Sequence, residues 1–436
     1  MNEEIQADKL LQPYRGTKDY FPKEMQKLNY IFNIWRKACN AFGYEEYLGP
    51  LLENRRLYTT KSASGDEVGN KQLYWFTDSA GRELGIRPEM TPTVSRMIGQ
   101  KINNLPKPVR WFSIANFMRN ERPQKGRTRE FFQLNADVFG VKSVAIDAEL
   151  VELAIYMMKL FGAGEKMFEI RINNRQWFTY WLTQIVGITQ NTQGVSRIID
   201  NFAKYTKEEN MQKLTEIGLS KDLIDQLFTI SEISMDLVRS YQDKCSGAAD
   251  LVGLLEMLKD CNLTEFVRFD PTLVRGFDYY TGNVFEQFDL TVGNNRSMFG
   301  GGRYDNLVGI YSGIDTPANG FAPGNVTTEL FLDSWNLWPK FNASAQVLVT
   351  VFSADLLEKS NEIIAKLREQ GISCKLYLGE KPSISDQLSY AAKKEIPYVI
   401  IYGPDEISQN KVVLKDMVKG EQKILGIGEI FDILRQ

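Results

Sequence analysis

The sequence predicts an α+β protein in which an antiparallel sheet is flanked by helices, with a helical insertion and a smaller α/β domain at the C-terminal end. Three observations support this prediction. The 436 residues are too many for one ordinary core, so two or three domains are expected. Short β-rich runs separated by turn residues occupy about residues 44–140. Beyond residue 344, strand and helix patterns alternate rapidly, as they do in small α/β domains.

The first clear element is a helix from Lys23 to Phe42. Its apolar residues recur at spacings of three and four, which places them on one face. Pro22 suits the start of a helix and Gly43 suits its end. The apolar stripe could dock a partner, but packing against the core of the protein is the favoured interpretation.

The next part of the chain favours antiparallel strands over regular βαβ units. A helix is expected from about 92 to 103, and residues 164–262 look mainly helical and charged, which is typical of an insertion. The expected strands are 73–77, 109–114, and runs within 266–288 and 297–304.

The pattern changes after the segment 335–340, where a second domain is expected to begin. Residues 347–352 form a continuous apolar run, and the helix after it is expected to end at Gln370, before Gly371. Further expected elements are a strand at 372–378, a helix at 383–394 and a strand at 398–402. This alternation predicts a mixed or parallel sheet.

Composition sets limits on the location and the partners. The net charge of −3 gives no general attraction to nucleic acid, so polyanions must be bound by local basic patches. The first ten residues are acidic and lack a signal-peptide pattern, and no apolar run reaches membrane-spanning length, so a cytoplasmic protein is expected. The four cysteines are scattered, so we expect buried thiols, with no disulfide framework and no metal site.

Histidine is absent from the chain. This excludes catalysis by a Ser-His-Asp or Cys-His arrangement and any metal held by imidazole. Compositional drift is the favoured explanation. A protein that could be translated during histidine starvation is the alternative, and it predicts that synthesis continues when histidine is withheld.

The densest chemical signal lies between Met118 and Glu130, where five basic and two acidic residues give a local net charge of +3. Pro123 and Gly126 mark a turn, so a hairpin loop with cationic side chains is expected. Phosphates are natural ligands of such a loop. Judged from charge alone, a solvated basic loop is the favoured interpretation.

A second segment, Leu273-Val-Arg-Gly-Phe-Asp-Tyr-Tyr-Thr-Gly-Asn-Val-Phe-Glu286, combines an arginine, a glycine and paired tyrosines. By itself it could be a structural aromatic strand. However, it resembles a signature of histidyl-tRNA synthetases, and Arg122-Pro-Gln-Lys-Gly-Arg127 resembles the histidyl form of motif 2 in class II aminoacyl-tRNA synthetases. Further resemblances are Arg15-Gly-Thr-Lys-Asp19, Arg87-Pro-Glu-Met-Thr-Pro-Thr93, Gly300-Gly-Gly-Arg-Tyr-Asp305 and, in the C-terminal part, 387–416.

The resemblance implies roles for individual residues of the two segments. Arg119 and Arg275 would be catalytic, because both would face the ATP α-phosphate during adenylate formation. Glu121 would lie close to the adenine. The residues that would approach the acceptor end of histidine tRNA are Arg122, Gln124 and Lys125.

The resemblance also implies a histidine pocket. Glu89 and Thr91, helped by Gln133, would bind the substrate ammonium group. The residues expected to line the remainder of the pocket are Tyr279, Tyr280, Tyr304 and Asp137. Asp137 stands where the family has a glutamate that binds the imidazole. It is one methylene shorter, so the pocket contracts or a water fills the gap.

Motif 3 departs further from the family pattern. Val326 and Thr327 stand where the family has a glutamate and an ATP-binding arginine. Arg303 or another cation could compensate for the missing arginine. The departure also leaves open a weaker ATP site, or a relative that no longer activates amino acids.

For the whole chain, the resemblance implies a class II catalytic domain at 1–335, interrupted by a helical insertion at about 175–262, and an anticodon-binding domain at 344–436. The expected enzyme is a homodimeric histidine–tRNA ligase, with Pro50 matching the motif 1 proline of the dimer interface. Its substrates would be L-histidine, ATP and histidine tRNA, with Mg²⁺ bridging phosphates. The alternatives are a regulatory relative, such as the histidine-sensing subunit of ATP phosphoribosyltransferase, and a catalytically silent tRNA-binding protein or sensor.

Overall fold

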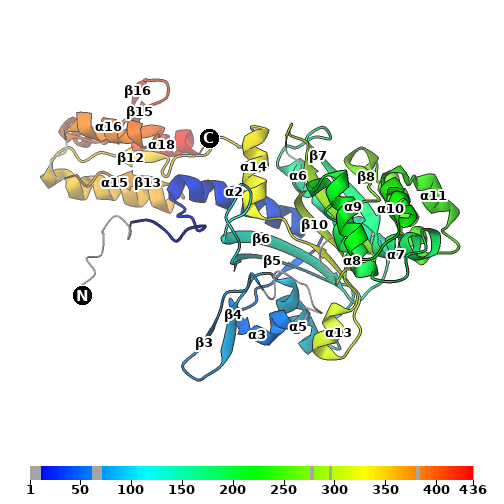
Figure 1. Ribbon diagram of the computed structural model, residues 1–436. Helices are drawn as coiled ribbons and strands as arrows, with labels where there is room; N and C mark the ends of the chain where they lie inside the picture. Colours follow the sequence, from blue (N-terminus) through cyan, green and yellow to red (C-terminus); the bar gives the residue numbers. More distant parts are fainter. Residues whose placement is uncertain (1–10, 61–70, 275–278, 294–296, 380–382, 436) are drawn as a thin grey trace. The chain divides into compact units, whose positions relative to one another are not determined.

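A computed structural model describes residues 11–60, 71–274, 279–293, 297–379 and 383–435. The chain divides into two compact units, residues 1–338 and 339–436. Figure 1 shows the helices and strands of each unit and labels many of them with the names used below.

The first unit is built on an eight-stranded sheet with the strand order β1-β5-β6-β11-β10-β9-β7-β8. Its strands are β1 (Glu45–Glu46), β5 (Val109–Met118), β6 (Glu130–Phe139), β7 (Phe168–Asn174), β8 (Val267–Phe269), β9 (Asn283–Asp289), β10 (Ser297–Arg303) and β11 (Ala318–Phe321). Among the described strands of this sheet, the outermost pairs, β1–β5 and β7–β8, are parallel, and the five pairs between them are antiparallel. The predicted antiparallel sheet is therefore confirmed.

Long helices bury their apolar faces against this sheet. The helix α2 spans Pro22–Ala41, with Pro22 in its first turn, and Gly43 follows it in the left-handed region (φ 73°). Its residues Ile31, Trp35 and Cys39 are buried in the same core as the helix α6 (Val144–Leu160). The apolar stripe predicted for this helix thus packs into the core. The helix α14 (Asn325–Ser334) lies against β6 and β10.

A small three-stranded sheet and three short helices lie beside the central hairpin. The strands are β2 (Leu52–Asn54), β3 (Trp75–Thr77) and β4 (Glu83–Ile86), in the order β2-β4-β3. The helices are α3 (Arg55–Thr59), α5 (Thr91–Lys101) and α13 (Leu307–Ser312). The helix predicted at about 92–103 corresponds to α5.

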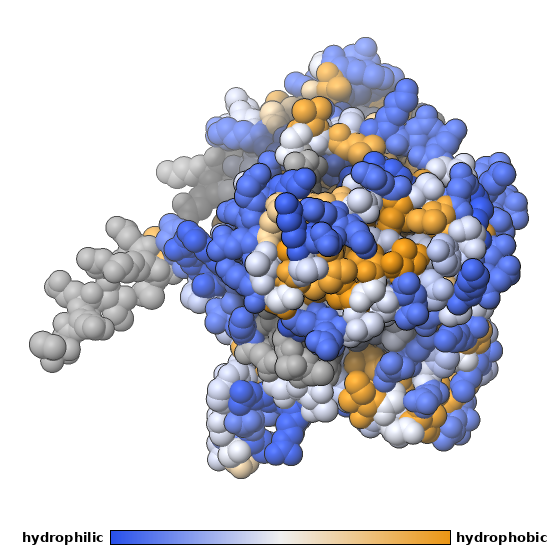
Figure 2. Space-filling model, turned by 45° about the vertical axis from the view of Figure 1, so that its right-hand side comes forward, coloured by the Kyte–Doolittle hydropathy of each residue, from blue (hydrophilic) through white to orange (hydrophobic). Residues whose placement is uncertain are grey.

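A helical segment separates β7 from β8 in the chain. It comprises α7 (Arg175–Tyr180), a π-helical turn (Trp181–Ile185), α8 (Thr192–Ile199), α9 (Lys207–Glu216), α10 (Lys221–Leu227), α11 (Met235–Ser240) and α12 (Ser246–Asp260). On the face shown in Figure 2, apolar residues reach the surface in patches bordered by hydrophilic ones. The helical reading of 164–262 missed β7, whose residues Phe168, Ile170 and Ile172 alternate inward at the spacing of a strand.

The second unit has a five-stranded mixed sheet in the order β13-β12-β14-β15-β16. Its strands are β12 (Val347–Val349), β13 (Cys374–Leu376), β14 (Tyr398–Ile401), β15 (Lys411–Asp416) and β16 (Gln422–Gly426). Its helices are α15 (Leu357–Glu369), α16 (Ile384–Lys393), α17 (Pro404–Ser408) and α18 (Ile427–Leu434). The β13, β12 and β14 strands are parallel, and the rest pair antiparallel. The mixed sheet agrees with the prediction.

The cysteines need one correction. All four are free thiols, and Cys39, Cys245 and Cys374 are buried as expected, but Cys261 is exposed. It follows α12 directly, where the chain turns at the surface. Of the helices that the structure describes, none is both long and apolar enough to cross a membrane.

Candidate active site

The predicted basic hairpin is present between β5 and β6, which pair from Val109↔Phe139 to Met118↔Glu130. At its tip, the backbones of Gln124 and Arg127 exchange hydrogen bonds of 3.0 and 2.8 Å. Gly126 has a φ of 80°, a conformation that a side chain would strain. The tip presents Arg122, Gln124 and Lys125 at exposed positions.

Arg119 lies at the base of this hairpin and is held in place there. Its Nε donates to the carbonyl oxygen of Pro88 at 2.9 Å, and its guanidinium lies 5.0 Å from the centre of the Phe131 ring. The hydrogen bond brings Arg119 next to the segment that carries Glu89 and Thr91. In the loop, the carboxylate of Glu121 pairs with Arg127 at 3.5 Å.

That segment is anchored by Arg87, which the sequence analysis left without a role. The side chain is only 2% exposed and donates to the carbonyl oxygens of Gly49 at 2.9 Å and Asn116 at 3.1 Å. It thereby joins the chain around Pro50 to β5. The sequence shows an arginine at the start of the segment 87–93, but the partners of its side chain are distant in the chain. Glu89 is buried, and Thr91 begins α5.

The structure brings together four of the residues predicted to bind histidine. The Tyr304 hydroxyl donates to Oδ1 of Asp137 at 2.5 Å, and both side chains are buried. The Tyr279 ring lies 5.8 Å from that of Tyr304 and 4.8 Å from that of Tyr280. Burial raises the pKa of Asp137 to about 7, and the Tyr304 hydrogen bond partly opposes the shift. A carboxyl and three tyrosines can bind a planar ring that has polar atoms.

Glycines leave room for this arrangement on the sheet. Gly320 of β11 lies opposite Asp137, and Gly302 of β10 lies opposite Gly320. A Cβ on Gly320 would come within 1.9 Å of Oδ1 of Asp137 and 2.8 Å of the Ala136 carbonyl oxygen. Because a backbone oxygen cannot move aside easily, only glycine fits here.

Gly320→Ala is therefore expected to displace the Asp137 carboxyl and to lower the free energy of unfolding by about 1–3 kcal/mol. Denaturant unfolding measures the stability, and calorimetric titration measures the affinity for histidine, which should fall. Gly164→Ala is the control, because a Cβ there meets no atom within 4 Å. Equal histidine affinity in Gly320→Ala and the unchanged chain would contradict this arrangement.

Gln133 contacts the region of motif 3. Its Nε2 donates to the Ala322 carbonyl oxygen at 3.1 Å, and its backbone pairs with Gly324. At the position of the family's arginine, the Thr327 hydroxyl donates to the carbonyl oxygens of Met298 and Gly324, at 3.0 and 3.1 Å. Thr327 therefore stabilises the start of α14.

Arg303, considered above as a substitute for the missing motif 3 arginine, has a structural position instead. It is buried and binds Asp147 through Nη2 at 2.5 Å, Asp250 at 3.6 Å and the Ser143 carbonyl oxygen at 3.1 Å. Its charge is thus used inside the protein, between β10 and α6. This compensation is therefore not supported.

Arg175, which directly follows β7, holds the two ends of the second motif. The Arg175 backbone N–H donates to the Gly282 carbonyl oxygen at 2.9 Å, and its Nη1 donates to that of Val274 at 2.9 Å. Arg275 lies outside the described residues, as do the three residues after it. Arg175 therefore ties both flanks of this motif to one point, a role that the sequence analysis did not assign.

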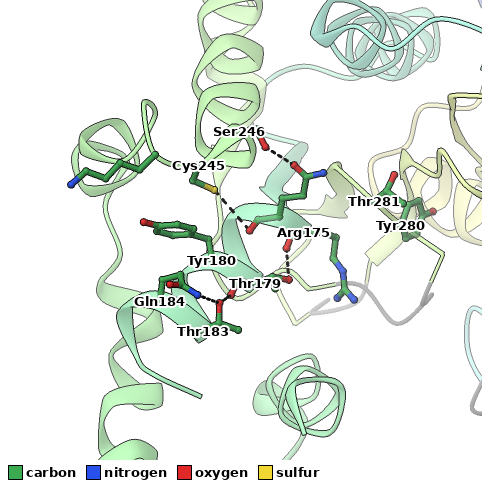
Figure 3. Close-up of a pocket in the computed structure, with 11 residues that line it drawn as sticks. Arg175, Thr179, Tyr180, Thr183, Gln184, Cys245, Ser246, Tyr280 and Thr281 are labelled. Carbon is green, nitrogen blue, oxygen red and sulfur yellow. Dashed lines mark hydrogen bonds between the residues drawn. The ribbon is translucent and has the colours of Figure 1, made fainter. Parts of the chain in front are cut away.

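A cavity of about 660 Å³ lies where this motif meets the helical segment. Figure 3 shows Tyr180 and Thr183 on one wall, Ser246 at the start of α12, and Tyr280 with Thr281 across from them. The complete lining is Arg175, Gln176, Thr179, Tyr180, Thr183, Gln184, Lys244, Cys245, Ser246, Tyr280 and Thr281. Two cations, several hydroxyls and amides, and two aromatic rings suit a phosphate-bearing ligand.

Known proteins resemble this chain over nearly its full length. A family model described as histidyl-tRNA synthetase matches residues 16–324, and one described as an anticodon binding domain matches residues 346–436. The histidine–tRNA ligase of Leptospira biflexa is 37% identical over 430 residues, which cover 97% of each chain. That of Opitutus terrae is 38% identical, over 92% of this chain and 93% of its own.

Solved structures share the fold. A histidyl-tRNA synthetase from Nostoc sp. PCC 7120 superposes with a TM-score of 0.81 at 21% identity, covering 98% of this chain and 99% of that one. A structure from Bacillus halodurans, described as an ATP phosphoribosyltransferase regulatory subunit/histidyl-tRNA synthetase, gives 0.72 at 22% identity, covering 87% and 96%.

The predicted fold class, that of a class II aminoacyl-tRNA synthetase with a separate C-terminal α/β unit, is confirmed. The chain belongs to the histidyl-tRNA synthetase family.

Proposed function

We propose that this chain is a histidine–tRNA ligase, which activates L-histidine with ATP to histidyl-adenylate and transfers it to the 3′ end of histidine tRNA. The observation that carries the proposal is that one sheet positions two features. These are the buried Asp137–Tyr304 pair, which suits an imidazole, and the hairpin of Arg119, which suits phosphates.

Activation would be an in-line attack of the histidine carboxylate on the α-phosphate of ATP, with pyrophosphate leaving. Glu89, Thr91 and Gln133 would hold the ammonium group, and the pocket of Asp137 would hold the ring. Arg119 and Arg275 would stabilise charge on the α-phosphate, while Glu121 would bind near the adenine. The acceleration would come from orientation and charge stabilisation, so no protein histidine is required.

ATP would enter as a substrate accompanied by Mg²⁺. Among the described residues, no three carboxylate, cysteine or histidine side chains are close enough together to hold a metal ion. Mg²⁺ commonly binds through substrate phosphates with few protein ligands, so ATP oxygens would be its main ligands here. The ion would neutralise the charge of the leaving pyrophosphate.

The RNA would be bound by local features, because the helical segment as a whole is acidic. Residues 175–262 contain nine basic and twelve acidic side chains. Arg122, Gln124 and Lys125 would approach the acceptor end, and residues 344–436 would bind the anticodon. The cavity beside Tyr280 would receive unpaired nucleotides of the 3′ end, since it adjoins the proposed histidine pocket and contains Arg175 and Lys244.

Lys244→Ala is expected to weaken tRNA binding about three- to tenfold, because one phosphate contact is lost. Histidine-dependent ATP–pyrophosphate exchange, measured without tRNA, should be unchanged. Lys259→Ala in the last turn of α12 is the control, because Lys259 is exposed and does not line the cavity. If Lys244→Ala weakens the binding of tRNA that lacks its unpaired 3′ end as much as the binding of intact tRNA, this placement of the 3′ end is wrong.

The active form would be a homodimer with Pro50 at its interface. Apolar side chains next to Pro50 reach the surface, with Leu48 69% exposed and Leu51 43% exposed. Exposed apolar groups of this kind are typical of a surface that binds another protein chain. Sedimentation velocity measures the assembly. The proposed compartment is the cytoplasm, which cell fractionation tests.

The rival function is that of a silent regulatory or tRNA-binding relative, and the altered motif 3 is its support. Against it are the hairpin tip and the match of residues 346–436 to an anticodon-binding domain. Histidine-dependent exchange of labelled pyrophosphate into ATP separates the two functions. The ligase gives robust exchange that no other amino acid supports, whereas a silent relative gives none.

A further inference from the structure

One buried polar group near the proposed histidine pocket has no partner in the part of the chain that the structure describes. The hydroxyl of Tyr47 is inaccessible to solvent and makes no hydrogen bond with any described residue. Leaving a hydroxyl buried and unpaired is unfavourable, so such groups call for an explanation. A ligand that supplies the missing partner is one explanation.

The position of Tyr47 follows from the sheet register. Its backbone N–H donates to the Phe112 carbonyl oxygen at 2.8 Å, which continues the parallel pairing of β1 with β5. Trp111 lies opposite Asp137 in the neighbouring pair of strands, and the Tyr47 and Trp111 rings are 5.6 Å apart. Tyr47 also packs against the cluster that contains Tyr304.

The surroundings of the hydroxyl carry opposite charges. Burial raises the pKa of Tyr47 well above its usual value, the nearby Asp137 carboxyl raises it further, and the Arg87 guanidinium lowers it. Asp137 belongs to the proposed imidazole site, and Arg87 begins the segment that carries Glu89 and Thr91.

We propose that the Tyr47 hydroxyl is a hydrogen-bond partner of the substrate imidazole, acting beside Asp137. The inference rests on the proposed function. A neutral imidazole has one N–H donor and one nitrogen acceptor. Oδ1 of Asp137 already accepts from Tyr304, and its other oxygen remains for the ring N–H. The phenol donates to the second ring nitrogen and occupies space that a longer acid at position 137 would fill.

Tyr47→Phe tests this directly, because it removes only the hydroxyl. The KM for histidine in pyrophosphate exchange should rise on the order of 10- to 100-fold, with kcat changed little, since the contact is present throughout the reaction. Calorimetric titration with histidine should show the same loss without turnover. Thermal stability should be equal or higher, because an unpaired buried group is removed.

Tyr44→Phe is the matched control. It makes the same change three residues earlier, but the Tyr44 hydroxyl already donates to Glu149 at 3.1 Å. It should leave the affinity for histidine unchanged and lower the stability slightly. If both variants lose histidine affinity equally, the effect belongs to the strand and the proposal is overturned.

A double variant adds a coupling test. Asp137→Glu lengthens the acid by one methylene and should conflict with Tyr47. In Tyr47→Phe the longer acid has more room. The double variant should therefore bind histidine more tightly than the sum of the two single losses predicts. Strictly additive losses would overturn the proposal. If the unsubstituted chain shows no exchange activity, the proposed function is refuted. If it shows normal exchange and Tyr47→Phe has the same KM for histidine, only this inference is refuted.

Discussion

Arg119→Ala is expected to lower the rate of histidine-dependent ATP–pyrophosphate exchange by about 10²–10³-fold, because a cation that meets the charge developing on the α-phosphate is lost. The side chain is held at the base of the hairpin by its hydrogen bond to Pro88 and by the ring of Phe131. The same loss is expected for Arg275→Ala. In both variants the affinity for tRNA, measured by filter binding, should persist.

Arg127→Ala is the control for this result. It lies in the same loop and also carries a positive charge, but its guanidinium pairs with Glu121 and its side chain is 59% exposed. Exchange should fall by less than about tenfold, because an exposed ion pair contributes little. Exchange retained in Arg119→Ala would show that the α-phosphate is bound elsewhere and would refute the proposed role of the hairpin.

Asp137→Asn is expected to separate activity from stability. Oδ1 of the new amide can still accept from Tyr304, but its NH₂ then faces the ring N–H of the substrate. Two donors facing each other in a buried site should reduce kcat/KM for histidine by about 10²-fold or more. Pyrophosphate exchange at several histidine concentrations measures the loss.

The same variant should be more stable than the unchanged chain at pH 8. The pKa of Asp137 is raised to about 7 in the folded state, against about 4 in the unfolded chain. The folded state therefore binds the proton more tightly, and stability falls as pH rises from about 4 to about 7. Asparagine does not ionise, so it should recover up to about 4 kcal/mol at pH 8 and little at pH 4.

Asp289→Asn provides the comparison for the stability measurement. Asp289 is also buried in the sheet, but its Oδ1 accepts hydrogen bonds from the Thr291 backbone, the Thr291 hydroxyl and Trp335, at 2.9, 2.7 and 2.9 Å. The amide weakens these bonds, so stability should fall and not rise at pH 8. Equal behaviour of the two variants in denaturant unfolding at pH 4 and pH 8 would contradict the assignment for Asp137.

Much of the fold follows from local patterns in the sequence. The helix α2 was predicted from its apolar spacing together with Pro22 and Gly43, since these signals act within a few residues. The hairpin of β5 and β6 was predicted from a turn between β-rich runs. The strand β7 was missed because a helical region follows it directly, and its alternation is short. Its place in the sheet depends on pairing with β9, far away in the chain.

The resemblance to the family named the candidate site residues, and the structure decided which of them lie together. Asp137, Tyr279, Tyr280 and Tyr304 meet because four antiparallel neighbours share one register, which no local pattern encodes. Arg303 is close to the site in sequence, yet burial and Asp147 direct its charge to the interior. The roles of Arg87 and Arg175 were invisible for the same reason, since their partners are distant backbone carbonyls.

The sequence by itself therefore determined the family, the largely antiparallel sheet and the choice of candidate site segments, because those depend on residue types and short spacings. Only the tertiary structure decided that the short acid at position 137 pairs with Tyr304, and that the Tyr47 hydroxyl is buried without a partner among the described residues. Those facts depend on side chains from separate strands that meet in a space excluded from water, where each polar group must find a partner or remain unpaired at a cost.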